Sequence, residues 1–161
     1  MIDWLIQRLT RRPPDFVIGG VDSPYLRRWW LIPRNRFFSI YLHEILRDDD
    51  DRALHDHPWW NCSILLRGRY IEIQPLTHPL APGKRSFRRE PFRPVFRTAR
   101  QAHRLCLELD TETHRLRPCW SLFIRGPVIR EWGFWCPQGW RRWQDFVANG
   151  DKGAVGKGCA E

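Results

Sequence analysis

The sequence has no long hydrophobic run. Nowhere do about 18 apolar residues follow one another, as a membrane-spanning helix would require. The opening residues also lack the long apolar stretch and cleavage site of a secretory signal peptide. We therefore expect no membrane contact and a cytoplasmic location.

A regular cysteine framework is absent as well. The chain holds 5 Cys, an odd number with no paired Cys-x-x-Cys spacing. Together with the lack of a signal peptide, this pattern predicts reduced thiols and no disulfide. Cys119 and Cys136 are expected to be buried structural thiols.

Acidic residues are outnumbered. Lys and Arg total 27 against 18 Asp and Glu, which gives a net charge of +9. Such a surface attracts anionic partners. The basic residues are scattered rather than grouped in one block, so nucleic acid is an unlikely partner and a small anionic substrate is favoured.

The length fits one domain with a sizeable core. We expect that domain to span residues 1–148, with its core built largely from the 10 Trp and 9 Phe. Residues 149–161 are rich in Gly and poor in large apolar groups, which predicts a disordered tail.

The apolar pattern changes along the chain. Ile2, Leu5, Ile6 and Leu9 have helical spacing and predict a short N-terminal helix before Pro13. Short β-branched or aromatic runs then alternate with Pro, Gly and Asp, which predicts an all-β antiparallel barrel or sandwich. The predicted strands are 37–45, 62–66, 70–73, 94–97, 104–109, 120–124 and 128–134.

One segment carries an unusual spacing of polar residues. In an extended chain alternate side chains share a face, so His55, His57 and Asn61 are expected to point the same way. Two imidazoles two residues apart can chelate one ion. The alternative is that both are solvent-facing loop residues.

This segment resembles the first motif of the cupin superfamily, which reads His-x-His, three or four residues, Glu, six residues, Gly. His55 and His57 are followed by three residues, then Asn61, then six residues and Gly68, so only the Glu is replaced. His103, which opens the predicted strand 104–109, matches the His of the second motif. The stretches 41–43, 55–59 and 131–134 are similar to those of uncharacterised bacterial and phage cupin-like proteins.

The resemblance implies a double-stranded β-helix, or jelly-roll, barrel with a metal inside. His55, His57 and His103 would be the ligands, and the expected ion is Fe(II), with Zn, Ni or Mn as alternatives. A three-His set without a carboxylate is similar to that of thiol dioxygenases. It implies a metal-dependent oxygenase; a non-catalytic metal- or ligand-binding cupin and a metal-dependent isomerase or hydrolase remain alternatives.

Other residues receive roles from their place near these histidines. Asn61 would be a weak fourth ligand or a hydrogen-bond partner, and Tyr41 or His43 would orient the substrate. Arg97 or Arg100 would bind its anionic group. The resemblance also implies a homodimer, while the Trp- and Arg-rich segment 131–143 is expected to close one end of the barrel.

Overall fold

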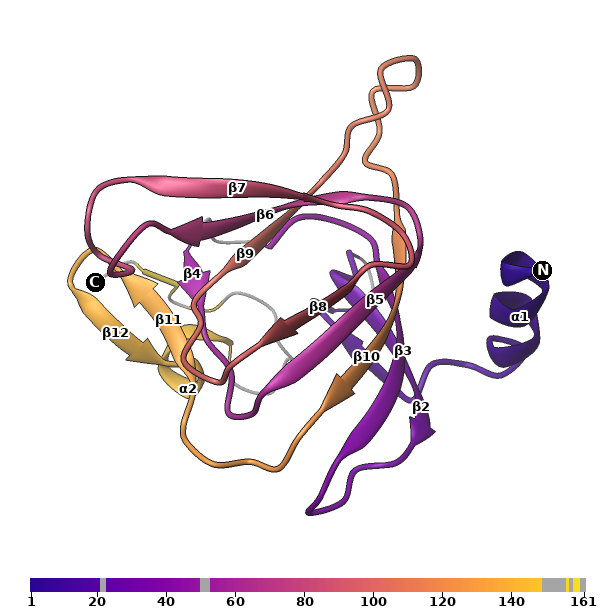
Figure 1. The fold of residues 1–161 in the computed structure, drawn as a ribbon, viewed down its shortest axis with the longest axis horizontal. Helices are drawn as coiled ribbons and strands as arrows, with labels where there is room; N and C mark the ends of the chain where they lie inside the picture. Colours follow the sequence, from indigo (N-terminus) through magenta and orange to yellow (C-terminus); the bar gives the residue numbers. More distant parts are fainter. Residues whose placement is uncertain (21–22, 50–52, 149–155, 157, 160–161) are drawn as a thin grey trace.

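A computed structural model describes residues 1–20, 23–49, 53–148, 156, 158 and 159. Strands dominate this part of the chain, and a helix lies near each end (Figure 1). In chain order the elements are α1 (Ile2–Leu9), β1 (Phe16–Ile18), β2 (Leu26–Ile32), β3 (Ser39–Ile45), β4 (Leu54–His55), β5 (Asn61–Arg67), β6 (Tyr70–Pro75), β7 (Lys84–Arg89), β8 (Pro94–Arg97), β9 (Arg104–Leu107), β10 (Cys119–Arg125), β11 (Gly133–Cys136), β12 (Gly139–Arg142) and α2 (Trp143–Phe146).

The strands form three antiparallel sheets. The largest has the order β1-β2-β3-β10-β5-β8, and the two three-stranded sheets have the orders β12-β11-β4 and β7-β6-β9. The small sheets face the large one across a common interior (Figure 1). Strands distant in sequence are therefore neighbours, as in the pairing of β3 with β10 and of β10 with β5. The all-β barrel and the N-terminal helix predicted from the sequence are confirmed.

Sequence alternation decides which side chains reach the interior. In β3, Tyr41 and His43 are buried on one face and Leu42 is buried on the other. Leu42 can be apolar and outward-facing because α1 covers this part of the sheet: Ile6 packs with Trp29, Leu42 and Trp120. An amphipathic helix thus supplies a second core outside the barrel.

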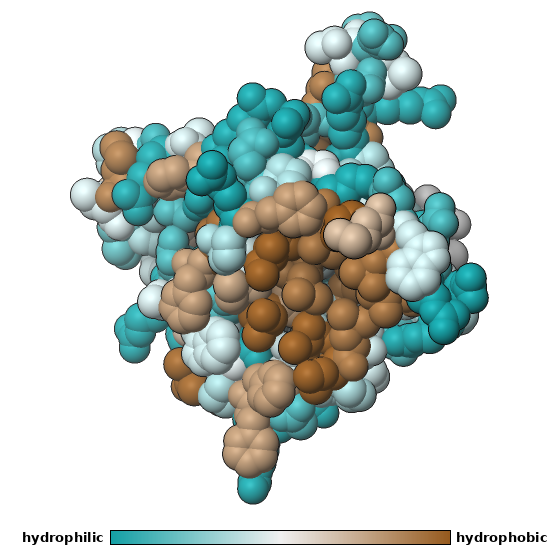
Figure 2. All heavy atoms as spheres, turned by 45° about the vertical axis from the view of Figure 1, so that its right-hand side comes forward, coloured by the Kyte–Doolittle hydropathy of each residue, from teal (hydrophilic) through white to brown (hydrophobic). Residues whose placement is uncertain are grey.

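Much of the remaining outer face of the large sheet is apolar and only partly covered. Figure 2 shows a continuous hydrophobic area on this side of the molecule. On the large sheet, Phe96 is 61% exposed, and the paired Ile64 and Leu122 are half-buried. The homodimer expected from the sequence stays a prediction.

The sequence analysis predicted no strand at β1, β2, β4, β7 or β12, and the strand predicted at 128–134 overlaps β11 only at residues 133 and 134. Two of the missed strands, β7 and β1, carry little sequence signal, for different reasons. β7 is a polar strand, with Lys84, Arg85, Arg88 and Arg89 among its six residues, and it pairs along one side with β6. An edge strand exposed to water needs no apolar alternation, so its sequence carries little signal. β1 spans three residues, which is too short for a periodic pattern.

The expectation of no disulfide is wrong. Cys136, at the end of β11, forms a disulfide with Cys159. The N–H groups of Gly156 and Gly158 donate hydrogen bonds to the carbonyl of Phe146, which brings the chain back beside β11. Cys62, Cys106 and Cys119 are free thiols. The rest of the predicted disordered tail, 149–155, 157 and 160–161, lies outside the described residues.

No helix in the described ranges is long and apolar enough to cross a membrane.

The contact between α1 and the sheet can be tested with two neighbouring residues. Ile6 is 4% exposed and Leu5 is 38% exposed on the same helix. We expect Ile6→Ala to lower the free energy of unfolding by about 2–4 kcal/mol, because it leaves a cavity against Trp29 and Leu42. Leu5→Ala should lower the free energy of unfolding by at most about 1 kcal/mol, because the Leu5 side chain is already partly exposed to solvent. Urea unfolding of both variants measures the difference, and equal losses would show that α1 does not pack as described.

Candidate metal centre

Two backbone segments bring the three histidines together. β4 ends at His55 and pairs with β11, where Phe134 lies opposite His55. His55 and His103 also exchange backbone hydrogen bonds, with N–O distances of 2.9 and 3.0 Å. The N–H of His57 donates to the carbonyl of Ala99 at 3.2 Å, which fixes the second histidine over the same region.

Asp56 anchors the turn between these histidines. Its side chain is buried and accepts hydrogen bonds from the N–H of Gly133 at 2.9 Å and from Trp140 Nε1 at 3.1 Å. Arg130 Nη1 lies 3.0 Å from the same carboxylate. Asp56 is thus held by β11, β12 and the preceding loop.

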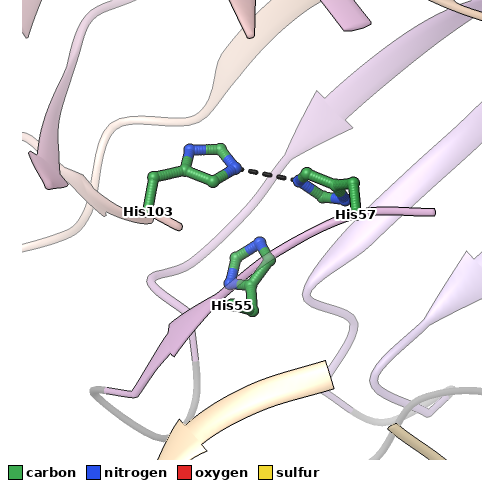
Figure 3. A group of neighbouring side chains, drawn as sticks. All are labelled: His55, His57 and His103. Carbon is green, nitrogen blue, oxygen red and sulfur yellow. Dashed lines mark hydrogen bonds between the residues drawn. The ribbon is translucent and has the colours of Figure 1, made fainter. Parts of the chain in front are cut away.

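The imidazoles of His55, His57 and His103 converge on one point. Nε2 of His57 and Nε2 of His103 lie 2.9 Å apart. Figure 3 shows these two nitrogens facing each other, with a ring nitrogen of His55 directed toward the space beside them. One nitrogen from each ring lies within 4.8 Å of the other two.

Burial keeps the rings of His57 and His103 neutral. Removal from water lowers the pKa of His57 well below its ordinary value, and the charges of His55 and His103 act in the same direction. Burial also lowers the pKa of His103, to about 4, although the nearby Glu72 carboxylate opposes the shift. Both rings are therefore uncharged at neutral pH, which is the form that offers a lone pair to a metal.

Glu72 stands directly behind His103. Its Oε1 lies 3.0 Å from His103 Nδ1. A carboxylate at this position favours a proton on Nδ1 and leaves Nε2 as the free acceptor facing His57. We infer this tautomer from the neighbouring groups.

Arg97 holds Glu72 in place. Arg97 Nε and Nη2 donate to the two carboxylate oxygens at 2.6 and 2.9 Å, and both side chains are buried. Arg89 adds a contact of 2.6 Å. Burial by itself would raise the pKa of Glu72, but the hydrogen bonds from His103 and Arg97 outweigh it and hold the pKa far below its usual range.

Comparison with known proteins identifies the architecture. No protein-family profile and no curated protein matches the chain. Among solved structures, a cupin-like protein from Thermotoga maritima MSB8 is similar with a TM-score of 0.53 at 12% identity, over 76% of this chain and 85% of that one. This chain has the cupin fold.

Two enzymes share the same cupin architecture. The DMSP lyase DddQ from Ruegeria pomeroyi DSS-3 is similar with a TM-score of 0.52 at 16% identity, over 80% of this chain and 61% of that one. The Fe(II) form of HppE gives a TM-score of 0.52 at 14% identity, over 73% of this chain and 57% of that one. The chain thus spans less than two thirds of the length of either enzyme. At these identities the likeness concerns the fold.

This chain departs from the usual cupin motif at position 61, and the structure shows what Asn61 contacts. Asn61 is buried on β5, and its Oδ1 accepts a hydrogen bond from Arg97 Nη1 at 3.3 Å. Its Nδ2 has no hydrogen-bond partner in the described part of the chain. Asn61 is thus joined to the histidines indirectly, through Arg97 and Glu72.

Arg97 and Arg100, the two arginines predicted to bind substrate, differ in burial: Arg97 is buried and Arg100 is exposed. Arg97 lines the cavity beside the histidines, but its nitrogens contact Glu72, Asn61, Ser63 and Tyr70. Arg100 is exposed and does not line that cavity. Their predicted roles stay untested, although the geometry gives Arg97 a structural partner already.

Tyr41 and His43 are both buried on one face of β3. Tyr41 Oη accepts a hydrogen bond from Arg125 Nε at 3.3 Å. His43 lines the cavity, and its ring packs against those of Tyr41 and Phe123 at centroid distances of 5.8 and 4.9 Å. Of the two, His43 is the one that a ligand in the cavity can reach.

A cavity of about 550 Å³ connects these groups. His43, His55, His57 and His103 all line it, and most of its other walls are aromatic or aliphatic. The rings of Trp59 and Trp132 lie 6.3 and 6.2 Å from the His57 ring. The histidines are therefore reached through an apolar chamber large enough for a small organic molecule.

The three imidazoles fit a divalent transition-metal ion. Two nitrogens each about 2.1 Å from one ion, at a right angle, are about 3.0 Å apart. The Nε2 atoms of His57 and His103, at 2.9 Å, match this separation. Neutral nitrogen donors suit iron, zinc, nickel or copper better than magnesium or calcium.

Sequence analysis missed Glu72, although a signal was present. Tyr70, Glu72 and Gln74 alternate with Ile71 and Ile73 in β6, and the polar set is the buried one. A strand whose polar face is buried indicates an internal hydrogen-bond network. The side chains of β6 alternate as in other strands, but here the polar set and not the isoleucines occupies the buried face.

Removal of the Glu72 charge should destabilise the protein. We expect Glu72→Gln to lower the free energy of unfolding by about 3–5 kcal/mol, because Arg97 would remain buried and charged without its partner. Glu108→Gln is the matched control, since Glu108 pairs with the exposed Arg88 and should contribute about 0–1 kcal/mol. Equal effects in chemical denaturation would contradict the buried pair.

His43 predicts a pH dependence of stability. Burial, with the Arg28 charge as a second cause, lowers its pKa well below 6.5 in the folded protein. In the unfolded chain the pKa is about 6.5, so acid protonates the unfolded state first and stability falls as the pH drops below about 6.5. His43→Gln removes this contribution while keeping an acceptor for Arg28. Between pH 7 and 5 the variant should lose about 1–2 kcal/mol less stability than the wild type. His114→Asn, at an exposed histidine, should follow the wild-type curve.

Proposed function

We propose that this cupin is a metal-dependent oxygenase that binds iron(II) through His55, His57 and His103 and acts on a small anionic substrate. The observation that carries the proposal is the convergence of three imidazoles on one point inside a cavity. Three protein ligands leave coordination positions for substrate and dioxygen. Iron(II) bound there would supply the one-electron and dioxygen chemistry that no side chain provides.

The residues around the histidines would position the ligands. Glu72 holds the His103 ring and its proton at Nδ1, and Arg97 holds Glu72. This support comes from β6 and β8, which are packed strands rather than flexible loops. Rigid support of this kind keeps ligand nitrogens within the small tolerance that a metal site needs.

The cavity walls would control solvent and substrate. Trp59 and Trp132 lie beside His57, and Trp132 stacks on Trp143 at 5.8 Å, so aromatic rings limit the access of water. His43 accepts a hydrogen bond at Nε2 from Arg28 at 2.8 Å. Its Nδ1 is then the nitrogen that carries a proton in the neutral ring, and it would serve as a donor that orients a substrate.

Metal binding is the first test. Protein made without a polyhistidine tag should bind one equivalent of Fe(II) after chelator treatment and reloading. His57→Ala should lower that affinity by about 100-fold or more while the protein stays folded, because aromatic and aliphatic strands form the core. His114→Asn is the matched control and should bind like the wild type. Metal analysis, with thermal unfolding of each apoprotein, separates lost binding from lost folding.

Oxygen consumption distinguishes the oxygenase from the alternatives. The iron-loaded protein should consume oxygen when supplied with small carboxylates or thiols, and His57→Ala should not. Tight zinc binding, with substrate turnover but no oxygen uptake, would contradict the oxygenase and favour Lewis-acid chemistry; DddQ, which shares the fold, is named a lyase. Ligand binding without turnover under any metal would indicate a non-catalytic cupin.

A further inference from the structure

Most charged groups lining the cavity are already paired. Arg97 is matched by Glu72 at 2.6 Å and Arg130 by Asp56 at 3.0 Å. Glu131 contacts Arg142. Asp49 accepts a hydrogen bond from the N–H of Leu105 at 2.7 Å and lies 3.7 Å from His55 Nδ1. Arg28 differs from these groups, because no carboxylate contacts it within the described residues.

Strand register places Arg28 in the cavity wall. Phe16, Arg28, His43 and Ser121 lie opposite one another across β1, β2, β3 and β10, and all four line the cavity. This row belongs to the large sheet, whereas the three candidate metal ligands come from the smaller sheets and the segments beside them.

The Arg28 side chain is held rigidly. Its Nε donates to His43 Nε2 at 2.8 Å. Its guanidinium carbon lies 4.7 Å from the centroid of the Tyr41 ring and 5.9 Å from that of Phe16. One nitrogen and the aromatic rings therefore fix the group, and its two terminal nitrogens have no protein partner among the described residues.

The charge persists despite this environment. Burial lowers the pKa of Arg28 to about 10, so the group remains protonated at neutral pH. A cation that is largely removed from water without an anion is costly, and a bound anion offsets that cost.

We propose that Arg28 binds the carboxylate of the substrate, whose apolar, ring-sized body lies against Phe123 and Trp132 and extends toward the histidines. Two terminal guanidinium nitrogens match the two oxygens of a carboxylate. The remaining walls are largely apolar and favour a substrate with one charged end. This inference rests on the proposed function, since it takes the cavity to be the substrate site, and it names a substrate class: apolar monocarboxylates.

The Arg28 site can be tested without the metal. Phenylacetate and its uncharged analogue phenylacetamide have nearly the same shape. Titration of chelator-treated protein, followed by calorimetry, should show phenylacetate binding at least about ten-fold more tightly. Equal affinities would overturn the proposal, and tighter binding of phenylphosphonate than of phenylacetate would overturn the assignment to carboxylates.

Variants locate the charge responsible. Arg28→Met should remove the preference for phenylacetate and leave phenylacetamide binding unchanged, and Arg28→Lys should keep part of the preference. Arg34→Gln is the matched control, because Arg34 also lines the cavity but is exposed. Loss of the preference in Arg34→Gln and not in Arg28→Met would overturn the proposal. If Arg28→Met fails to fold, Arg28→Lys and the two-ligand comparison in the wild type still decide it.

His57→Ala separates this inference from the proposed function. The variant should lose metal binding and retain the preference for phenylacetate over phenylacetamide. Binding of phenylacetate that requires the metal, and that disappears in His57→Ala, would place the carboxylate on the ion instead of on Arg28. An apoprotein that binds phenylacetate through Arg28 but never takes up metal would contradict the proposed function and leave the Arg28 site intact.

Discussion

The Glu72 carboxylate is the point at which folding and the candidate metal centre meet. It is fully buried, and it contacts His103 on one side and Arg97 on the other. Burial of either charge alone would be strongly unfavourable, so each depends on the other. Because Glu72 comes from β6, Arg97 from β8 and His103 from the segment before β9, this contact joins two sheets and orients one of the three imidazoles.

The same network explains the loss of a carboxylate at position 61. The usual cupin motif places a Glu on the face shared by the two histidines, whereas Asn61 here accepts a hydrogen bond from Arg97. A Glu at this position would compete with Glu72 for Arg97 and would place two carboxylates close together. The carboxylate of this chain is therefore not on β5 but on β6, where Glu72 contacts Nδ1 of His103.

Much of the fold could be predicted because most strands have ordinary patterns. Short β-branched or aromatic runs predicted β3, β5 and β10, and the spacing from His55 to Gly68 identified the cupin motif. The polar edge strand β7 and the disulfide to Cys159 could not be predicted, since neither depends on local apolar periodicity. His55 and His57 were accessible because their spacing is local, and His103 was assigned from the resemblance to the second cupin motif. Glu72 was harder to find, since its importance arises from neighbours 25 and 31 positions away in sequence, Arg97 and His103, which only folding brings into contact.

Arg97 and Arg28 show why charge type alone does not identify a substrate-binding residue. Both project into the interior from the large sheet, and both line the cavity. Arg97 faces a carboxylate supplied by the chain, so its charge is already balanced within the protein. Arg28 faces a histidine whose pKa is lowered by burial and by Arg28 itself, so its nearest titratable partner stays neutral and cannot balance it. A divalent ion at the histidines would add more positive charge to the same chamber, and the demand for an external anion would increase.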